Sequence, residues 1–166
     1  LLMSSFFGSV AAAVEVKESL LAALGEGDAP GVIREFNEIL ASIPFDDYDA
    51  ADKKTKRRLR GLDFGEFLYR SSIYTFLRGA GLDVKAEVHG HRGRSDLAVS
   101  YLGRVWVMEL KISGKDDDDA PLARKAFDQI LESGYADQYS QPHLLGIVIN
   151  DKKRAITAWK SGLKAG

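Results

Sequence analysis

Residues 93–113 read GRSDLAVSYLGRVWVMELKIS, and this stretch decides the sheet. Apolar side chains alternate on either side of Gly103, a pattern that predicts two strands joined by a tight turn. A two-residue turn places Asp96 directly opposite Glu109. Lys111 follows on the same face as Glu109, because side chains two residues apart in a strand share a face. The hairpin is therefore predicted to hold three charged side chains together.

Two opposed carboxylates in this hairpin need an explanation. Directly opposed side chains have Cβ atoms about 5 Å apart, where like charges repel. A cation between Asp96 and Glu109 removes the repulsion, and two oxygen ligands with open positions are typical of a Mg²⁺ site. Lys111 can then orient water or a phosphate oxygen, which suits phosphodiester hydrolysis. The alternative is that both acids form ion pairs with nearby arginines, namely Arg92, Arg94 and Arg104.

The composition narrows the class of protein. With 166 residues and 45% hydrophobic content, the chain can form one domain with a core. Lys and Arg number 23 against 24 Asp and Glu, which excludes a globally basic nucleic-acid coat. No cysteine is present, so disulfides and thiolate metal sites are excluded. The start, LLMSSFFGSVAAAV, lacks the basic region of a signal peptide, and no run has transmembrane length. We expect a piece of a longer cytoplasmic protein without membrane contact.

The remaining chain predicts helices and three more strands around this hairpin. Its expected elements are helices at 10–24, 28–40, 64–78 and 119–139, and strands at 82–89, 144–150 and 154–159. The side chains that repeat with helical spacing along the third helix, and so are expected on one face, include Ser71 and Tyr74. The apolar run at 144–150 predicts a strand buried on both faces, and the last strand is expected to be shorter.

These elements predict an α/β fold with one mixed sheet. Short connections make the first three strands an antiparallel meander, and a helical crossover makes the fourth parallel to a strand before it. Residues 1–42 form a predicted N-terminal helical hairpin that joins a missing upstream domain, and residues 43–166 form the main domain. The basic run KKTKRRLR at 53–60 is either a solvated linker or a phosphate-contacting patch.

Several of these stretches resemble a known superfamily of nucleases. GRSD at 93–96 followed by WVMELK at 106–111 resembles the PD-(D/E)XK nuclease superfamily. Residues 66–97, 126–139 and 144–160 look like the branch found C-terminal to AAA-ATPase-like domains in prokaryotic proteins. The resemblance covers residues 43–160 and implies a restriction-endonuclease-like, three-layer core.

The resemblance also implies site residues. Asp96 and Glu109 match the acids of the motif and Lys111 its lysine. Glu66 matches a helix glutamate that often completes the metal site, and Gln129 matches a glutamine that positions substrate or water. The Leu110 carbonyl is the expected third protein ligand of Mg²⁺ or Mn²⁺.

Alternatives to these roles stay open. Glu66 can instead pair with Arg70, four residues later on the helix, and Gln129 can be an ordinary flanking residue. Glu87 is either a further acid of the site or a surface residue. Arg70 stands where the branch tends to show histidine; it can contact phosphate, or it can neutralise Glu66.

The sequence supports two functions. The first is a Mg²⁺-dependent nuclease domain that cuts nucleic acid, with DNA the expected polymer. The alternative is a catalytically silent nuclease-like domain that binds nucleic acid or protein as a module of an ATPase. In both, the expected partner within the protein is an upstream ATPase-like domain.

Overall fold

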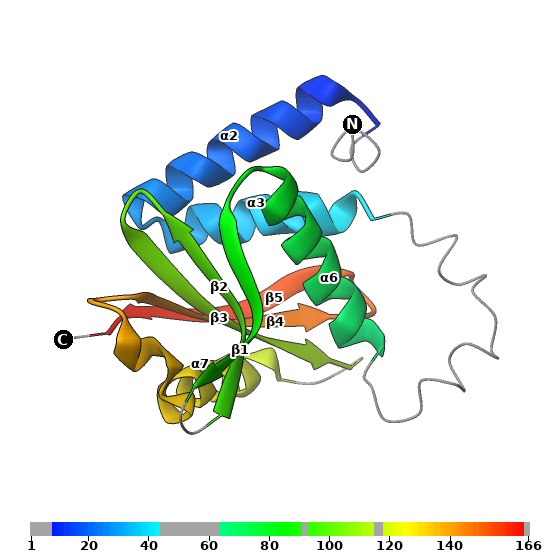
Figure 1. Ribbon diagram of the computed structural model, residues 1–166. Helices are drawn as coiled ribbons and strands as arrows, with labels where there is room; N and C mark the ends of the chain where they lie inside the picture. Colours follow the sequence, from blue (N-terminus) through cyan, green and yellow to red (C-terminus); the bar gives the residue numbers. More distant parts are fainter. Residues whose placement is uncertain (1–7, 44–63, 91–92, 115–117, 165–166) are drawn as a thin grey trace.

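A mixed five-stranded sheet forms the centre of the molecule in the computed structural model, which describes residues 8–43, 64–90, 93–114 and 118–164 (Figure 1). The helices are α2 (Val10–Glu26), α3 (Ala29–Ala41), α6 (Phe64–Gly79), α7 (Asp119–Ser133) and the 3₁₀ turn η1 (Tyr135–Gln138). The strands are β1 (Asp83–Gly90), β2 (Gly93–Tyr101), β3 (Arg104–Ser113), β4 (His143–Asn150) and β5 (Ala155–Leu163).

The strands lie in sequence order, β1-β2-β3-β4-β5. Neighbours pair antiparallel except β3 and β4, which are parallel and are connected through α7. The predicted α/β class, with an antiparallel meander followed by a parallel strand, is confirmed. In Figure 1, α2 and α3 lie on one side of the sheet and α7 lies on the other.

The β2–β3 hairpin has the predicted register. Tyr101 pairs with Arg104, and the ladder continues to the pair of Leu97 with Met108. The two turn residues, Leu102 and Gly103, have φ angles of 48° and 77°. Two positive φ angles are typical of a type I′ turn, whose twist matches that of the flanking strands. The tight turn therefore sets which side chains of the two strands face each other.

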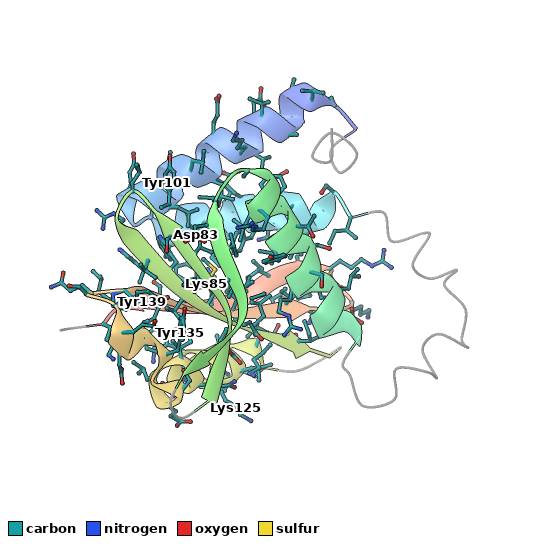
Figure 2. All side chains as sticks on the ribbon, viewed as in Figure 1. Asp83, Lys85, Tyr101, Lys125, Tyr135 and Tyr139 are labelled. Carbon is teal, nitrogen blue, oxygen red and sulfur yellow. The ribbon has the colours of Figure 1, made fainter. Side chains whose placement is uncertain are left out.

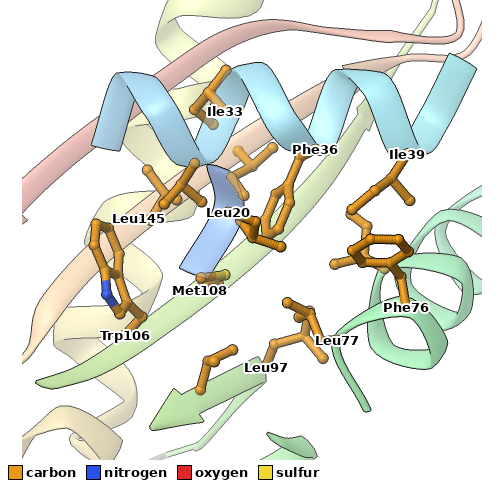
Figure 3. Packing of buried hydrophobic residues seen from close by; sticks show 14 of the residues in the cluster. Leu20, Ile33, Phe36, Ile39, Phe76, Leu77, Leu97, Trp106, Met108 and Leu145 are labelled. Carbon is orange, nitrogen blue, oxygen red and sulfur yellow. The ribbon is translucent and has the colours of Figure 1, made fainter. Parts of the chain in front are cut away.

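The N-terminal helices pack directly on the sheet. Ser9 caps α2 by accepting the Ala12 amide at 3.1 Å, and Pro30 stands in the first turn of α3, where its missing N–H costs nothing. Leu20 and Phe36 are fully buried in the same apolar cluster as residues of β3 (Figure 3). The division at residue 42 stays a prediction, although the helical hairpin and the sheet share this cluster.

Two apolar clusters cover the two faces of the sheet. The larger cluster lies under α2, α3 and α6, and the smaller one contains Ala98, Val107, Ile130, Tyr135 and Leu144. On the smaller side, β4 approaches α7 so closely that a Cβ at Gly146 would lie 2.5 Å from the Phe127 amide nitrogen. This close contact fixes α7 against the parallel pair of strands.

The 3₁₀ turn η1 closes the α7 side of the sheet. The rings of Tyr135 and Tyr139 meet edge to face with centroids 5.4 Å apart, and their hydroxyls are hydrogen-bonded to each other. Both residues are labelled in Figure 2, near the 3₁₀ turn. Burial, followed by the contact with Tyr139, raises the pKa of the Tyr135 hydroxyl. Tyr135 is therefore a neutral, buried part of this packing layer.

Three details of the sequence prediction are wrong. The helix expected at 119–139 ends at Ser133, because Gly134 adopts a left-handed conformation and the chain continues as the 3₁₀ turn η1. The buried stripe of α6 runs through Tyr69, Ile73 and Phe76, whereas Ser71 and Tyr74 are only half-buried. The strand β5 has nine residues and is not shorter than β4, which has eight. In contrast, β4 is buried on both faces as predicted.

The basic run at 53–60 lies outside the described residues. Among the helices that the structure does describe, none combines the length and the apolar character needed to cross a membrane.

Candidate active site

Asp96 lies where β2 leaves its regular pairing with β3. The side chain is buried, at 6% exposure, and Oδ2 accepts the Leu110 amide at 2.8 Å. This bond lies beyond the last regular pair of the ladder, so a carboxylate satisfies the β3 backbone there. The other oxygen, Oδ1, accepts a hydrogen bond from Arg70 Nη1 at 3.2 Å. Asp96 is thus held rigidly at the point where the two strands part.

Glu109 lies on β3 and is more deeply buried, at 3% exposure. Its Oε1 accepts a hydrogen bond from Lys111 Nζ at 3.0 Å. Its Oε2 is buried and accepts no hydrogen bond from the part of the chain that the structure describes. Burial, followed by the negative charge of Asp96, raises the pKa of Glu109 from 4.5 to about 7, and Lys111 partly offsets this.

Lys111 connects the buried acids with solvent. It lies two residues after Glu109 on the same face of β3, and its side chain is 22% exposed. The site therefore brings together two buried carboxylates, one of them with an oxygen that lacks a partner among the described residues, and an ammonium group that reaches solvent. Carboxylate oxygens of this kind are ligands that suit a hard divalent cation. The three charged residues of the hairpin are therefore brought together.

Arg70 was expected to pair with Glu66 or to contact phosphate, and the structure places it against Asp96. The two residues are 26 positions apart, so no local pattern indicated the contact. Three other arginines were proposed as partners of the two acids. One of them, Arg104, lies at the turn end of β3 and donates a hydrogen bond to the Gly25 carbonyl at 2.6 Å. Arg92 and the Arg94 side chain lie outside the described residues.

The other predicted site residues have weaker support. Glu66 and Glu87 lie on α6 and β1, but their side chains are outside the described residues, and Gln129 is half-buried on α7. The Leu110 amide donates a hydrogen bond to Asp96. The role of the Leu110 carbonyl as a metal ligand stays a prediction. Within the described part of the chain, no group of three His, Cys, Asp or Glu side chains is placed to hold a metal ion. Asp96 and Glu109 therefore form a pair of acids.

A polar junction that sequence reasoning missed lies at the far end of β3. Ser113 continues the face of Glu109 and Lys111 and is 2% exposed. Asp119, the first residue of α7, accepts a hydrogen bond from Thr157 of β5. Burial alone raises the pKa of Asp119, but the hydrogen bond from Thr157, together with the nearby Ser113 and Asn150 side chains, outweighs it and lowers the pKa. This junction ties the start of α7 to the sheet beside the site.

Comparisons with known proteins agree with this geometry. A family model described as the PD-(D/E)XK nuclease superfamily matches residues 64–159, which include both acids and the lysine. A protein of Azotobacter chroococcum mcd 1, described as "Uncharacterized protein in vnfD 5'region", is 31% identical over 136 residues. That alignment covers 80% of this chain and 24% of the relative, so the chain spans about a quarter of the relative's length. No solved structure matches this chain.

Proposed function

Because this chain belongs to the PD-(D/E)XK nuclease superfamily, we propose that it is a metal-dependent nuclease domain that hydrolyses phosphodiester bonds in DNA. One observation carries the proposal. Asp96 and Glu109 are buried on neighbouring strands, and Lys111 Nζ lies 3.0 Å from Oε1 of Glu109 while Oε2 has no partner among the described residues. A buried carboxylate oxygen without a partner is costly in a purely structural site.

The two acids fit a hard divalent cation. The repulsion that raises the pKa of Glu109 is relieved when a cation binds both carboxylates, and oxygen ligands suit Mg²⁺ or Mn²⁺. Asp96 and Glu109 would hold the ion, and we assign further ligand roles to Glu66 and the Leu110 carbonyl. When bound, the ion supplies Lewis-acid activation of the phosphate and of the attacking water.

The side chains of this domain would position the reactants. Lys111 reaches solvent from the buried pair, so its ammonium group can orient the attacking water or hold a phosphate oxygen. Gln129, on the helix that packs on the α7 side of the sheet, is assigned to positioning substrate or water. The Leu110 amide holds Asp96 in place through its bond to Oδ2.

The test is cleavage of duplex DNA in the presence of Mg²⁺. Cleavage is expected to stop on addition of EDTA, and Lys111→Ala is expected to lower its rate by about 10²–10⁴-fold. Lys160→Ala is the matched control, because Lys160 lies on β5 with its Nζ 3.8 Å from Asp128 and should not affect cleavage. Cleavage that survives EDTA, or that proceeds at full rate in Lys111→Ala, contradicts the mechanism.

A second function is favoured by one observation. Asp96 already has a positive partner in Arg70, which is what a catalytically silent domain would also show. Such a domain would bind DNA or protein as a module of an ATPase, without metal-dependent turnover. Calorimetry with Mn²⁺ separates the two functions, because the nuclease requires binding that Asp96→Asn and Glu109→Gln abolish.

We further propose that the domain belongs to the branch that follows AAA-ATPase-like domains and that such a domain is its partner. In support, the relative is long enough to contain further domains, since this chain spans 24% of it. The cytoplasmic location stays a prediction. Purification of the full-length protein should yield ATP hydrolysis, and its absence argues against this assignment.

A further inference from the structure

Arg70 forms an ion pair with Asp96, which is one of the two predicted metal ligands. A positive side chain at this place needs a functional explanation. Nη1 of Arg70 donates to Oδ1 of Asp96 at 3.2 Å, and the two side chains are 13% and 7% exposed. The second oxygen of Asp96 accepts the Leu110 amide. Both oxygens of this carboxylate are therefore engaged before any cation binds.

The two acids of the site differ in this respect. Glu109 offers a buried oxygen, Oε2, without a partner among the described residues, so a cation reaches it without displacing a group. At Asp96 a cation meets the positive charge of Arg70 on Oδ1. Two positive charges a few ångströms apart repel strongly at a poorly solvated position. Binding of a cation by both acids therefore requires that Arg70 leaves Oδ1.

The backbone around Arg70 is anchored, so the exchange needs only a movement of the side chain. The neighbouring Tyr69 is 1% exposed, and its hydroxyl donates to Asp151 Oδ1 at 2.8 Å. Ile73, one turn further along α6, is fully buried. These contacts hold α6 on the sheet while the guanidinium of Arg70 remains at the rim of the site.

We propose that Arg70 is a built-in counter-ion that a divalent cation displaces from Asp96 and that then binds the phosphate of the substrate. This rests on the proposed nuclease function. The guanidinium is largely buried, so the donor that leaves Oδ1 needs a new acceptor. A phosphate brought to the two acids by the cation would be a suitable acceptor, because the fork of an arginine side chain matches the oxygens of a phosphate. Arg70 would thus neutralise the empty site and afterwards position the substrate.

Mn²⁺ calorimetry at low ionic strength tests the first half of the proposal. Arg70→Gln is expected to bind Mn²⁺ about tenfold more tightly than the wild type, because no counter-ion must be displaced. Arg78→Gln is the matched control, because Arg78 is an exposed arginine in the last turn of the same helix and should leave the affinity unchanged. If Arg70→Gln fails to fold, Arg70→Met keeps the packing of the buried stem without the charge and should likewise tighten Mn²⁺ binding about tenfold.

Binding of a short duplex oligonucleotide tests the second half. In a Lys111→Ala background with saturating Mn²⁺, adding Arg70→Gln is expected to weaken duplex binding about fivefold or more. Adding Arg78→Gln should have a smaller effect. Opposite changes in cation and duplex affinity identify a positioning residue, since a merely structural role would weaken both.

The outcomes separate this inference from the proposed function. Unchanged Mn²⁺ affinity in both Arg70 variants, together with loss of binding in Asp96→Asn, overturns the counter-ion role and leaves the metal site intact. Tighter Mn²⁺ binding without weaker duplex binding overturns the phosphate contact. Absence of Mn²⁺ binding in the wild type and in both Arg70 variants overturns the metal site and the inference together.

Discussion

The two ends of the β2–β3 hairpin are built from the same alternating strands, yet their side chains are satisfied in different ways. At the turn end, Trp106 is fully buried, stacks on His143 with ring centroids 4.5 Å apart, and donates to the Leu24 carbonyl at 3.1 Å. At the open end, Asp96 and Glu109 are buried acids, and one oxygen of Glu109 has no partner among the described residues. The turn end stabilises the fold, whereas the open end carries an electrostatic cost that a bound cation would remove.

The largest expected effect on stability comes from Trp106→Ala at the turn end. The free energy of unfolding should fall by about 3–5 kcal/mol, because a large cavity forms and the Leu24 carbonyl loses its donor. Urea unfolding at pH 7 measures this. Trp159→Ala is the matched control, because Trp159 is 38% exposed on β5 and its loss should cost less than about 1 kcal/mol.

The contrast between the ends also predicts what Trp106→Ala leaves intact. The open end of the hairpin is not altered, so the folded variant should bind Mn²⁺ with the affinity of the wild type. Equal destabilisation by the two tryptophan substitutions would contradict the role assigned to the turn end.

In contrast to Trp106→Ala, Glu109→Gln at the open end is expected to raise the free energy of unfolding of the metal-free protein. The folded protein keeps a proton on Glu109 up to about pH 7, while the unfolded chain releases it near 4.5. The free energy of unfolding of the wild type therefore falls as the pH rises from 4.5 to about 7, and the full loss of stability is present above pH 7. At pH 8 the metal-free variant should be more stable than the wild type by roughly 2–3 kcal/mol, with metal binding lost.

Thermal and urea unfolding between pH 4 and pH 8, in the presence of EDTA, measure this difference. The gain should shrink toward zero at pH 4, where both states hold the proton. Glu132→Gln, an exposed acid on α7, serves as the control and should leave stability unchanged. A variant that is less stable than the wild type at pH 8 would show that the acid pair is satisfied without a cation.

The smallest effect is expected at the turn itself. Gly103 has a φ of 77°, and a Cβ there would meet no atom within 4 Å, so Gly103→Ala changes only the backbone energy. The expected loss is about 1 kcal/mol. Gly79→Ala, on the exposed last turn of α6, should instead be neutral or stabilising by up to about 1 kcal/mol. Denaturant midpoints compare the two, and an equal effect would show that the type I′ turn does not restrain the hairpin.

Much of the fold followed from local patterns. The alternation on either side of Gly103 and the two-residue turn predicted the register, and the apolar run of β4 predicted a strand buried on both faces. The stripe of α6 was misplaced because Phe67, Leu68 and Tyr74 also repeat with helical spacing, and only packing against the sheet decides which face is buried. The length of β5 was underestimated, since its edge position tolerates polar side chains.

Some features of the candidate site could also be predicted from the sequence, and others could not. Pleat and register placed Asp96 near Glu109 and put Lys111 on the same face. The partner of Arg70 could not be predicted, because α6 and β2 are far apart in sequence and only their packing brings the two charges together. The roles of Glu66 and Gln129 remain predictions that come from the family.

By itself, the sequence determined which residues alternate, where the hairpin turns and that two acids and a lysine share one region of the sheet. These are properties of neighbours along the chain, and backbone geometry with period two converts them directly into faces and pairs. Only the tertiary structure decided how deeply the acids are buried, which oxygen of Glu109 lacks a partner among the described residues, and which arginine pairs with Asp96. Those properties depend on the packing of α6, α7 and the parallel strand around the hairpin, since burial and long-range charge contacts are not encoded in any local pattern.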